Sequence, residues 1–421
     1  MRACVWLVAA AAALAADDLA PETLLLARIK TKTGENLRRL PNYTCLQTVE
    51  RSLRRVPSRK FELLDMLRLE VALVGGKELY SWPGAGRFED RKLSDLVQSG
   101  ATGEGAFALH ARSVFLSNGP TFTYAGPRER DGRKTERYDY RVPQMLSGFT
   151  LRVAGRQAIV GYHGSFWADA ATLDLLRLEV IADDIPPHLQ LASASNFMEY
   201  GRMRIGEADF LLPVSSELTM TDLTGNESRN LTRFDSCRQY AGESFLSFAE
   251  PPPVESAAPP PVVLAPIQLP AGLLLEVKLE SAIDLRKAAI GDPVVATVNR
   301  DVKRNKETLV PKGAQVTGRI ERMEKWRTGG RFWLVALRFS AIEFDRRQGD
   351  FHATLDSAGP MYTSGPRLSR DLYLALERSE PSLKSETSPS GFYLPASQPM
   401  LPKGFRTTWK TEITVDNGET K

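Results

Sequence analysis

The chain has 421 residues, of which 42% are hydrophobic and 25% are charged. An apolar share of this size supplies buried cores and excludes an intrinsically disordered protein, and the length indicates about two or three domains. The net charge is +4, and residues 266–421 carry 24 basic against 19 acidic residues, a surplus of +5. A surplus this small indicates an ordinary hydrated surface, so nucleic acid is not an expected partner.

The first residues have the pattern of a secretory signal peptide. Arg2 precedes the apolar run Ala3–Ala16, which ends in a small-x-small cleavage site. The run is too short to span a bilayer, which takes about 20 residues, and no other stretch approaches that length. Cys4 lies too early for a lipid-modified cysteine. We therefore expect residues 1–16 to be removed and the mature chain to be periplasmic or secreted, with no transmembrane span.

Two cysteines remain in the mature chain, Cys45 and Cys237. An exported compartment permits a disulfide, which would join the first strand of an N-terminal domain to its last. Closing so long a loop stabilises a domain by about 4–5 kcal/mol in the chain-entropy model. The alternative is two buried free thiols. Because no Cys-x-x-Cys motif is present, neither a zinc site nor thioredoxin-like redox chemistry is indicated.

Residues 17–250 open with a predicted helix, a strand and a hairpin. The helix begins near Pro21 and ends before Pro41, because proline favours the first helical turn and stops a helix interior. Residues 42–51 alternate in the manner of a strand, with Tyr43, Cys45, Gln47 and Val49 on one face. Residues 61–82 have the pattern of a hairpin whose turn is a Gly-Gly pair.

The rest of this first domain is predicted to be mostly strand. Short helices are expected over 92–98 and 106–116, with a glycine-rich loop between them. The expected strands then cover 121–124, 137–142, 149–153, 158–167, 173–182, 196–205, 210–220 and 227–240. Such a meander of antiparallel strands indicates a curved sheet or an open barrel, whose concave face the helices would cover.

A strand-turn-strand phrase carries a resemblance to a known family. The run Gly164–Leu178 has an aromatic strand, an acidic turn and an arginine-bearing strand. Together with Phe210–Val214 and Arg233–Tyr240, it resembles the periplasmic lipoprotein-carrier proteins of the LolA type. The resemblance covers about residues 17–250. It implies a half-open barrel with an apolar cavity for acyl chains.

The chain lacks the usual catalytic and metal-binding motifs. HExxH, GxSxG and paired Cys/His clusters are absent, so we expect no metal and no cofactor. His163, Ser165 and Asp169 lie close together in sequence, and a periplasmic hydrolase that uses His163 with a nearby acid is the alternative hypothesis. His163 and Ser165 lie two apart on one predicted strand, which lacks the geometry of a catalytic triad. We therefore assign no catalytic residue.

Two other groups of residues suggest a binding role. The basic cluster between the first strand and the hairpin comprises Arg51, Arg54, Arg55, Arg59 and Lys60. We expect it to be a solvated loop, and contact with anionic lipid headgroups is the alternative. Trp82, Phe166 and Trp167 are candidate lining residues of a ligand cavity, and ordinary core packing is the alternative for them.

A proline-rich stretch, residues 251–270, separates two parts of different character, and we assign 251–268 as a linker. Proline fixes φ and lacks a backbone donor, so the stretch is expected to be an extended polyproline-II spacer. At about 3.1 Å per residue, about 20 residues span about 60 Å, which would let the two parts act far from each other. A docking peptide for a proline-binding module is the alternative.

Residues 269–421 are predicted to form a second, smaller β domain. An aliphatic-Pro-x-Gly phrase, which suits a turn, occurs at 269–272, 310–313 and 401–404. The strands expected here cover 273–280, 293–299, 314–323, 331–344 and 405–415.

The order of glycines and prolines in this second part also resembles a known family. Over about residues 269–356 it is similar to the β-barrel domain of TrbI-like conjugation and type IV secretion proteins, which implies a small barrel. Two departures argue against a secretion channel. A cleavable signal stands in place of the inner-membrane helix of that family, and a Ser/Pro-rich insertion at about 357–400 stands in place of its apolar helical pair.

The sequence thus predicts a mainly β (α+β) protein with a curved antiparallel open barrel, covering helices, a linker and a small β-barrel or sandwich. We expect an exported, non-enzymatic envelope protein that binds a lipid or a lipoprotein. Acyl chains are the expected ligands of the first domain, and another envelope protein is the expected partner of the second.

Overall fold

The structure is a computed structural model of the chain. It describes residues 19–85, 88, 93–96, 102–153, 155–240, 265–325, 332–358, 391–395, 397 and 399–412. The predicted signal peptide, and residues 251–264 of the proline-rich stretch, lie outside these described residues. Among the helices that the structure describes, none combines the length and the apolar character needed to cross a membrane.

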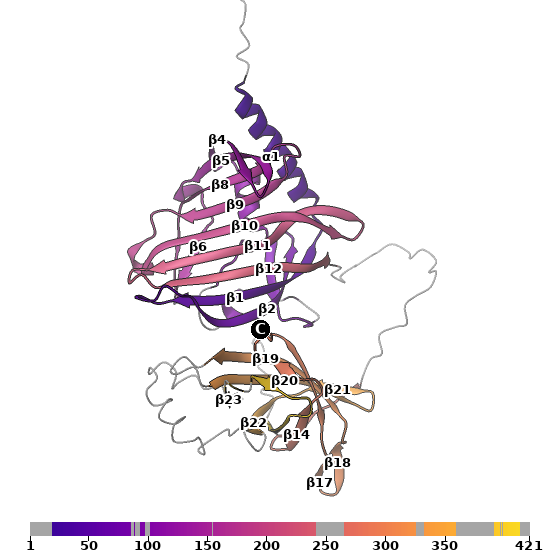
Figure 1. Cartoon of the computed structure of the whole chain (residues 1–421). Coiled ribbons are helices and arrows are strands. Elements are labelled where there is room, and N and C mark those ends of the chain that lie inside the picture. Colours follow the sequence, from indigo (N-terminus) through magenta and orange to yellow (C-terminus); the bar gives the residue numbers. More distant parts are fainter. Residues whose placement is uncertain are drawn as a thin grey trace, which may run out of the picture.

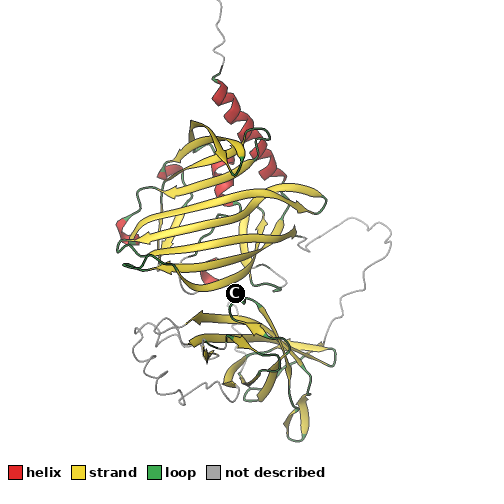
Figure 2. Cartoon of the chain, in the orientation of Figure 1, coloured by secondary structure: helices red, strands yellow, loops and turns green. Residues whose placement is uncertain are grey.

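The first part of the chain forms a ten-stranded sheet that curls into an open half-barrel (Figures 1 and 2). Its strands are β1 (Tyr43–Arg54), β2 (Glu62–Val74), β3 (Lys77–Ser81), β4 (Thr121–Arg130), β5 (Arg133–Val142), β8 (Tyr162–Asp169), β9 (Leu175–Ala182), β10 (Leu191–Ile205), β11 (Ala208–Asp222) and β12 (Glu227–Gln239). Their order is β3-β2-β1-β12-β11-β10-β9-β8-β5-β4. Neighbouring strands are antiparallel, which confirms the predicted mainly β open barrel.

The prediction of a single strand over 158–167 is wrong. Residues 156–159 form β7 (Arg156–Ile159), which pairs with β6 (Thr150–Val153) in a separate hairpin, and β8 begins afterwards. The break falls at Gly161, where a Cβ would lie 3.0 Å from the backbone N of Gln144. This close passage of two backbones favours glycine at the break between the two strands.

Three helices lie with the first sheet: α1 (Pro21–Arg39), α2 (Leu93–Leu96) and α3 (Leu109–Leu116), and the short 3-10 turns η1 (Gln144–Leu146) and η2 (Pro187–Leu189) lie in its loops. Pro21 begins α1, as predicted. The buried face of α1 includes Ile29, Thr33 and Leu37, which are spaced one helical turn apart. Gly34 lies where α1 faces α3, since a Cβ there would lie 3.4 Å from Leu116 Cδ2.

A disulfide joins the first and the last strand of this sheet. β1 and β12 are neighbours, and Cys45 on β1 is bonded to Cys237 on β12. The antiparallel register shifts between Thr44 and Leu46, on either side of the cysteine. The predicted pair is therefore confirmed, and two free thiols are not what the structure contains.

The second part of the chain forms a nine-stranded sheet. Its strands are β13 (Ala265–Pro266), β14 (Leu274–Leu279), β16 (Pro293–Val298), β19 (Gln315–Lys325), β20 (Phe332–Phe344), β21 (Arg347–Asp350), β22 (Ala353–Ala358), β23 (Gly391–Pro395) and β25 (Arg406–Thr411). Two separate two-stranded sheets accompany it: β15 (Ile283–Asp284) with β24 (Met400–Leu401), and the hairpin of β17 (Val302–Arg304) with β18 (Glu307–Val310).

The aliphatic-Pro-x-Gly phrases of this part are turns, as predicted. Gly272, Gly313 and Gly404 have φ values of 83°, 90° and 80°, a region that favours glycine, and β14, β19 and β25 begin directly after them. In the described part of the predicted insertion, residues 391–395 pair with β20 as strand β23. Residues 359–390 of the insertion lie outside the described residues.

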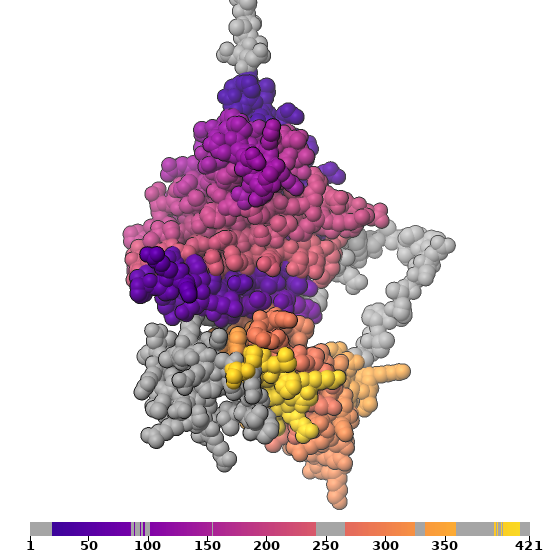
Figure 3. All heavy atoms as spheres, in the orientation of Figure 1, coloured from indigo at the N-terminus to yellow at the C-terminus, as the bar shows by residue number. Residues whose placement is uncertain are grey.

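The two parts contact each other at the edge of β2 (Figure 3). β3 pairs with β2 only from Glu70 onward, so the preceding residues of β2 form a sheet edge. There Ile290 forms a parallel bridge with Leu67. The Ile290 N–H donates to the Met66 carbonyl, and the Arg68 N–H donates to the Ile290 carbonyl, each at 2.8 Å. A residue of the second part thus extends the first sheet where β3 stops.

Side chains reinforce this contact. Arg68 Nη1 and Asp292 Oδ1 form an ion pair at 2.5 Å. The Trp82 ring lies 5.0 Å from the Arg319 guanidinium, and a Cβ on Gly291 would lie 2.6 Å from the same ring. The two parts are therefore in direct contact, a point that the sequence left open.

Candidate ligand-binding site

Most of the concave face of the first sheet is apolar. Its buried residues include Tyr138, Phe166, Leu178 and Met198, which lie on four strands. We call residues 102–116, which comprise a loop and α3, the cover. The cover packs on this face through aromatic contacts, with Phe115 5.1 Å from Phe166 between ring centroids. The interior is thus an apolar surface covered by this segment and by α1, whose Ile29 and Leu37 belong to the same buried cluster.

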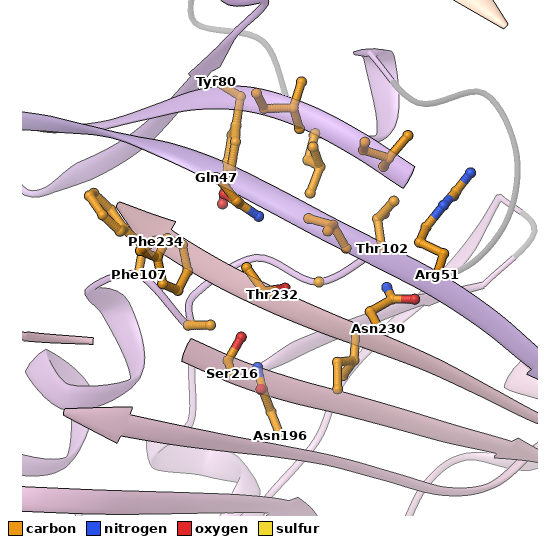
Figure 4. A pocket seen from close by; sticks show the side chains of 17 residues that line it. Gln47, Arg51, Tyr80, Thr102, Phe107, Asn196, Ser216, Asn230, Thr232 and Phe234 are labelled. Carbon is orange, nitrogen blue, oxygen red and sulfur yellow. The ribbon is translucent and has the colours of Figure 1, made fainter. Parts of the chain in front are cut away.

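The concave face becomes polar toward one end of the barrel. Six buried side chains, which we call the polar band, are Gln47 and Arg51 on β1, Asn230 and Thr232 on β12, Ser216 on β11 and Asn196 on β10 (Figure 4). In register, Arg51 faces Asn230, and Thr232 faces Ser216. Leu218 on β11 faces both Asn230 and Asn196. The polar band therefore crosses four adjacent strands.

The polar band lines a small cavity. Its volume is about 20 Å³, and Thr102, Gly103 and Phe107 of the cover close it (Figure 4). The cover lies directly on the sheet here, since a Cβ on Gly103 would lie 2.6 Å from Leu218 Cδ2. A cavity of this size has room for about one water molecule. The open apolar cavity that the family resemblance implies is therefore filled by the cover.

Two side-chain oxygens of the polar band lack a hydrogen-bond donor among the described residues. They are Oε1 of Gln47 and Oδ1 of Asn196. The two residues are 4% and 3% exposed, so bulk water does not solvate them. A buried acceptor left without a donor costs about 1–3 kcal/mol. A hydrogen-bond donor that reached these two oxygens would remove this cost.

The charge within the polar band is paired. Arg51 donates to both carboxylate oxygens of Asp65, from Nε at 2.7 Å and from Nη2 at 2.5 Å. Asp65 lies opposite Arg51 on β2, and both side chains are buried. A two-pronged contact of this kind neutralises the guanidinium locally. The pair therefore gives this end of the interior no net charge.

The carboxylate of Glu78 anchors the cover to the sheet. Glu78 lies on β3, and its Oε1 accepts hydrogen bonds from the backbone N–H groups of Ala108 at 2.8 Å and Leu109 at 3.2 Å. Its Oε2 accepts from the N–H of Gly105 at 2.8 Å and from the hydroxyl of Tyr80 at 2.7 Å. Burial raises the pKa of Glu78 above its usual value, and these hydrogen bonds oppose that rise.

His110 is a second buried titratable group in the cover. It is 7% exposed, and its ring lies edge-on to Phe149 with 5.3 Å between centroids. Gly105 has a φ of +97°, and a Cβ there would lie 3.0 Å from His110 Nε2. Burial lowers the pKa of His110 to about 4. The imidazole is therefore neutral at physiological pH.

A second pocket, of about 190 Å³, lies between α1 and the sheet. Its walls include Lys32 on α1 and Arg202 on β10, which both pair with Asp174 at 2.9 Å. Asn36 of α1 also exchanges hydrogen bonds with the backbone of Leu211. These contacts attach α1 to the sheet, which is a structural role.

The three predicted ligand-lining aromatics lie in different places. Phe166 is fully buried in the apolar interior. Trp167 points to the opposite, convex face, where its ring lies 5.8 Å from the Arg177 guanidinium. Trp82 lies at the contact between the two parts. None of the three lines either pocket described above, so a ligand contact by these residues stays a prediction.

The residues named in the alternative hydrolase hypothesis come together only in part: His163 has an acidic partner, Asp183, but Ser165 and Asp169 bond to other groups. His163 Nδ1 lies 2.6 Å from Asp183 Oδ1, and the imidazole is about half exposed on the convex face. Ser165 donates instead to Asp139 at 2.7 Å. Asp169 accepts hydrogen bonds from the backbone of the turn that follows it, including the Thr172 N–H at 2.8 Å. The described residues therefore do not place Ser165 or Asp169 in contact with His163.

The prediction of a solvated loop is wrong for part of the basic cluster. β1 continues through Arg54, and its alternation places Arg51 on the concave face, where the side chain is buried. Arg55, Arg59 and Lys60 lie beyond the strand and are exposed, as predicted.

Gln47, Asn196 and Glu78 were not identified from the sequence as site residues. For Gln47 a signal exists, because it occupies the same face as Tyr43, Cys45 and Val49 and is the polar member of that set. Glu78 offers no such signal, since it contacts backbone groups about 30 positions later in the chain, at Gly105 to Leu109.

Within the described ranges, no group of His, Cys, Asp and Glu side chains is arranged to hold a metal ion.

No family model matches the chain, and no curated protein matches its sequence. Among solved structures, it is similar to a domain described as an outer membrane lipoprotein-sorting protein from Vibrio parahaemolyticus, with 13% identity, 50% of this chain and 92% of that chain covered, and a TM-score of 0.27. It is also similar to a DUF1329 family protein from Desulfovibrio piger. The identity is 11%, the match covers 52% of this chain and 92% of that chain, and the TM-score is 0.28. A third similar structure is ComB10 of the Com type IV secretion system of Helicobacter pylori. The identity is 13%, the match covers 34% of this chain and 86% of that chain, and the TM-score is 0.20. TM-scores this low carry no argument, so the function is argued from the site.

Proposed function

We propose that the chain is an exported, non-enzymatic envelope protein that holds a lipid or a lipoprotein acyl chain between the first sheet and the cover. The observation that carries this proposal is the apolar concave face, which α1 and the cover close in place of a second sheet. A curved sheet whose interior is covered in this way becomes a continuous apolar trough when the cover moves aside, and such a trough suits a hydrocarbon chain.

The polar contacts between cover and sheet support this movement. In the described residues they run through side chains, from Glu78 to backbone N–H groups and between the hydroxyls of Ser113 and Tyr162 at 2.6 Å. The cover contributes no strand to the sheet. A ligand that replaces the apolar contacts of Phe107 and Phe115 therefore displaces the cover without breaking a strand pair.

Mass spectrometry under native conditions tests the proposal on protein purified from its own cell envelope. We expect a bound lipid or acylated species, which delipidation removes and which added fatty acid replaces. The Glu78→Gln variant weakens the anchor and should take up a fluorescent fatty acid faster than the parent chain. Glu136→Gln, which changes a carboxylate that bonds the exposed Tyr124, is the matched control and should leave uptake unchanged. Recovery of no lipid, together with no uptake, would sink the proposal.

Export and the envelope partner are proposed with it. The signal peptide prediction is checked by N-terminal sequencing of the protein from its cell, where a start close to Asp17 is expected. That the second sheet engages another envelope protein stays a prediction.

A further inference from the structure

The unpaired oxygens of Gln47 and Asn196 define which chemical group the interior accepts. Both are acceptors, so a group that satisfies them must donate hydrogen bonds. They lie on β1 and β10, at opposite margins of the polar band, with β12 and β11 between them. Hydroxyls of Ser216 and Thr232 lie in the same wall of the cavity. This wall is therefore rich in oxygen atoms that a polar ligand group can contact.

The site also selects against a charged group. The guanidinium of Arg51 is paired with the Asp65 carboxylate, both buried, so this end carries no net charge from the pair. A ligand cation or anion placed here would lose its hydration without gaining an opposite charge. An uncharged donor, an amide N–H or a hydroxyl, loses far less.

The position of the polar band next to the apolar interior indicates the chemical nature of the rest of the ligand. Phe107 and Phe234 border the same cavity, and their rings lie 5.3 Å apart at the start of the apolar interior. A molecule that fills both regions has a hydrocarbon chain along the apolar face and a neutral polar group at the band. The cavity of about 20 Å³ admits this group only when the cover is displaced, so the inference rests on the proposed function.

We propose that Gln47 and Asn196 form a specificity site for lipids whose first polar group is an uncharged hydrogen-bond donor, an amide N–H or a hydroxyl. An ester or ether of the same length has no N–H or O–H to donate, so it leaves the two amide oxygens without a hydrogen bond. Such mismatches at sites built for a hydrogen bond discriminate strongly between near-isosteric ligands.

The test compares two uncharged probes that differ in one atom group. N-dodecylacetamide carries an N–H where dodecyl acetate carries an oxygen. Delipidated full-length protein is titrated with each probe in competition with a fluorescent fatty alcohol, whose polar group is uncharged. We expect the amide to bind about tenfold more tightly, in line with one retained hydrogen bond. In the double variant Gln47→Leu/Asn196→Leu, the two probes should bind within about twofold of each other.

A matched control and a folding readout accompany the test. Gln239→Leu changes an exposed glutamine of β12 and should keep the tenfold preference. Urea unfolding of the double variant shows whether it folds, and we expect its stability to be equal to or above that of the parent chain, because two unpaired acceptors are removed.

The remaining outcomes of the binding experiment contradict either the specificity site alone or lipid binding as a whole. Equal binding of both probes by the parent chain would mean that water alone fills the site, which defeats the specificity proposal and leaves lipid binding intact. A preference for the amide that survives in the double variant would place the acceptor of the ligand N–H at another residue. If neither probe nor any fatty acid binds, the proposed function fails and the specificity site fails with it.

Discussion

The carboxylate of Glu78 accepts a 2.8 Å hydrogen bond from the backbone N–H of Ala108. This bond joins the edge strand β3 to the first turn of α3. Ala108 has no side chain that caps a helix, and the structure shows no side-chain cap from that position. A carboxylate at a helix N-terminus also interacts favourably with the helix dipole. Glu78 thus supplies from another element the cap that the sequence of α3 lacks.

Replacement of Glu78 should loosen the cover. In Glu78→Gln one accepting oxygen becomes a donor that faces the Gly105 N–H, and the charge-assisted hydrogen bonds are lost. Hydrogen bonds to charged groups contribute about 1.5–3 kcal/mol, so we expect the exchange protection of the amides of Ala108 and Leu109 to fall at least tenfold. Hydrogen exchange read by NMR measures this, and unchanged protection would show that packing alone holds the cover.

His110 should make the first sheet sensitive to acid. Its folded pKa of about 4 lies below the usual 6.5, so the unfolded chain binds the proton first. The stability that neutral His110 contributes is fully present above pH 6.5 and is lost as the pH falls toward 4. The loss is about 3 kcal/mol at about 1.4 kcal/mol per unit. Urea unfolding from pH 7.5 to 4 should show it, and His110→Gln should flatten the curve.

Protonation of Glu78 changes the stability of the fold in the opposite direction to protonation of His110. This gives an internal control for the acid sensitivity. Because burial raises its folded pKa above 4.5, the folded chain binds this proton first. Its contribution to stability is largest below the usual pKa and falls as the pH rises through the raised value. Removing this group in Glu78→Gln should therefore make the acid loss from His110 steeper than in the parent chain. A shallower curve in that variant would contradict the assignment of the two groups.

Much of the first sheet could be predicted because its signals are local. Alternation in 42–51 and the Gly-Gly turn of the hairpin each specify a strand or a turn from neighbouring residues alone. The disulfide between Cys45 and Cys237 followed from export and from the positions of the two strands. The break at Gly161 was not predictable, because it depends on the approach of Gln144, which the local pattern does not encode.

The candidate site was not predictable for the same reason. Asn196 and Gln47 share one cavity only because β12 and β11 place β1 near β10, which is a property of strand order. The aromatics Phe166 and Trp167 looked alike in sequence, but adjacent residues of a strand point to opposite faces. Trp82 followed a hairpin and meets Arg319 of the second part, about 240 positions later, which no local pattern indicates.

The buried pair of Arg51 and Asp65 should show strong coupling. Asp65→Asn leaves the guanidinium buried without its carboxylate, and we expect a loss of about 3–5 kcal/mol of unfolding free energy. The double variant Arg51→Met/Asp65→Leu removes both charges and should lose much less. Urea unfolding of the single and double variants gives the coupling energy. Additive losses would mean that the pair is not desolvated as the structure has it.

Reduction of the disulfide should destabilise the first sheet. Cys45 and Cys237 are 192 positions apart, so the bond restricts the unfolded chain over almost the whole first sheet. Loss of a native disulfide typically costs about 2–5 kcal/mol. Urea unfolding of Cys45→Ala/Cys237→Ala against the parent chain measures the cost. Non-reducing peptide mapping of the exported protein should recover the linked peptides, and two free thiols there would contradict the pairing.

The contact between the two parts should depend on Gly291. Its φ is +97°, and a Cβ would lie 2.3 Å from the Arg68 carbonyl oxygen, so Gly291→Ala is strained in backbone and in space. The bridge between Leu67 and Ile290 should then open, and the amides of Arg68 and Ile290 should exchange freely while the rest of each sheet keeps its protection.

Gly313→Ala is the matched control, because Gly313 has a φ of +90° but no atom within 4 Å of a Cβ. It carries the same kind of backbone strain away from the contact, so it should leave those two amides protected. If both variants exposed the two amides equally, backbone strain in the second sheet, and not the close approach at Gly291, would account for the loss. If neither did, the contact would not depend on this glycine.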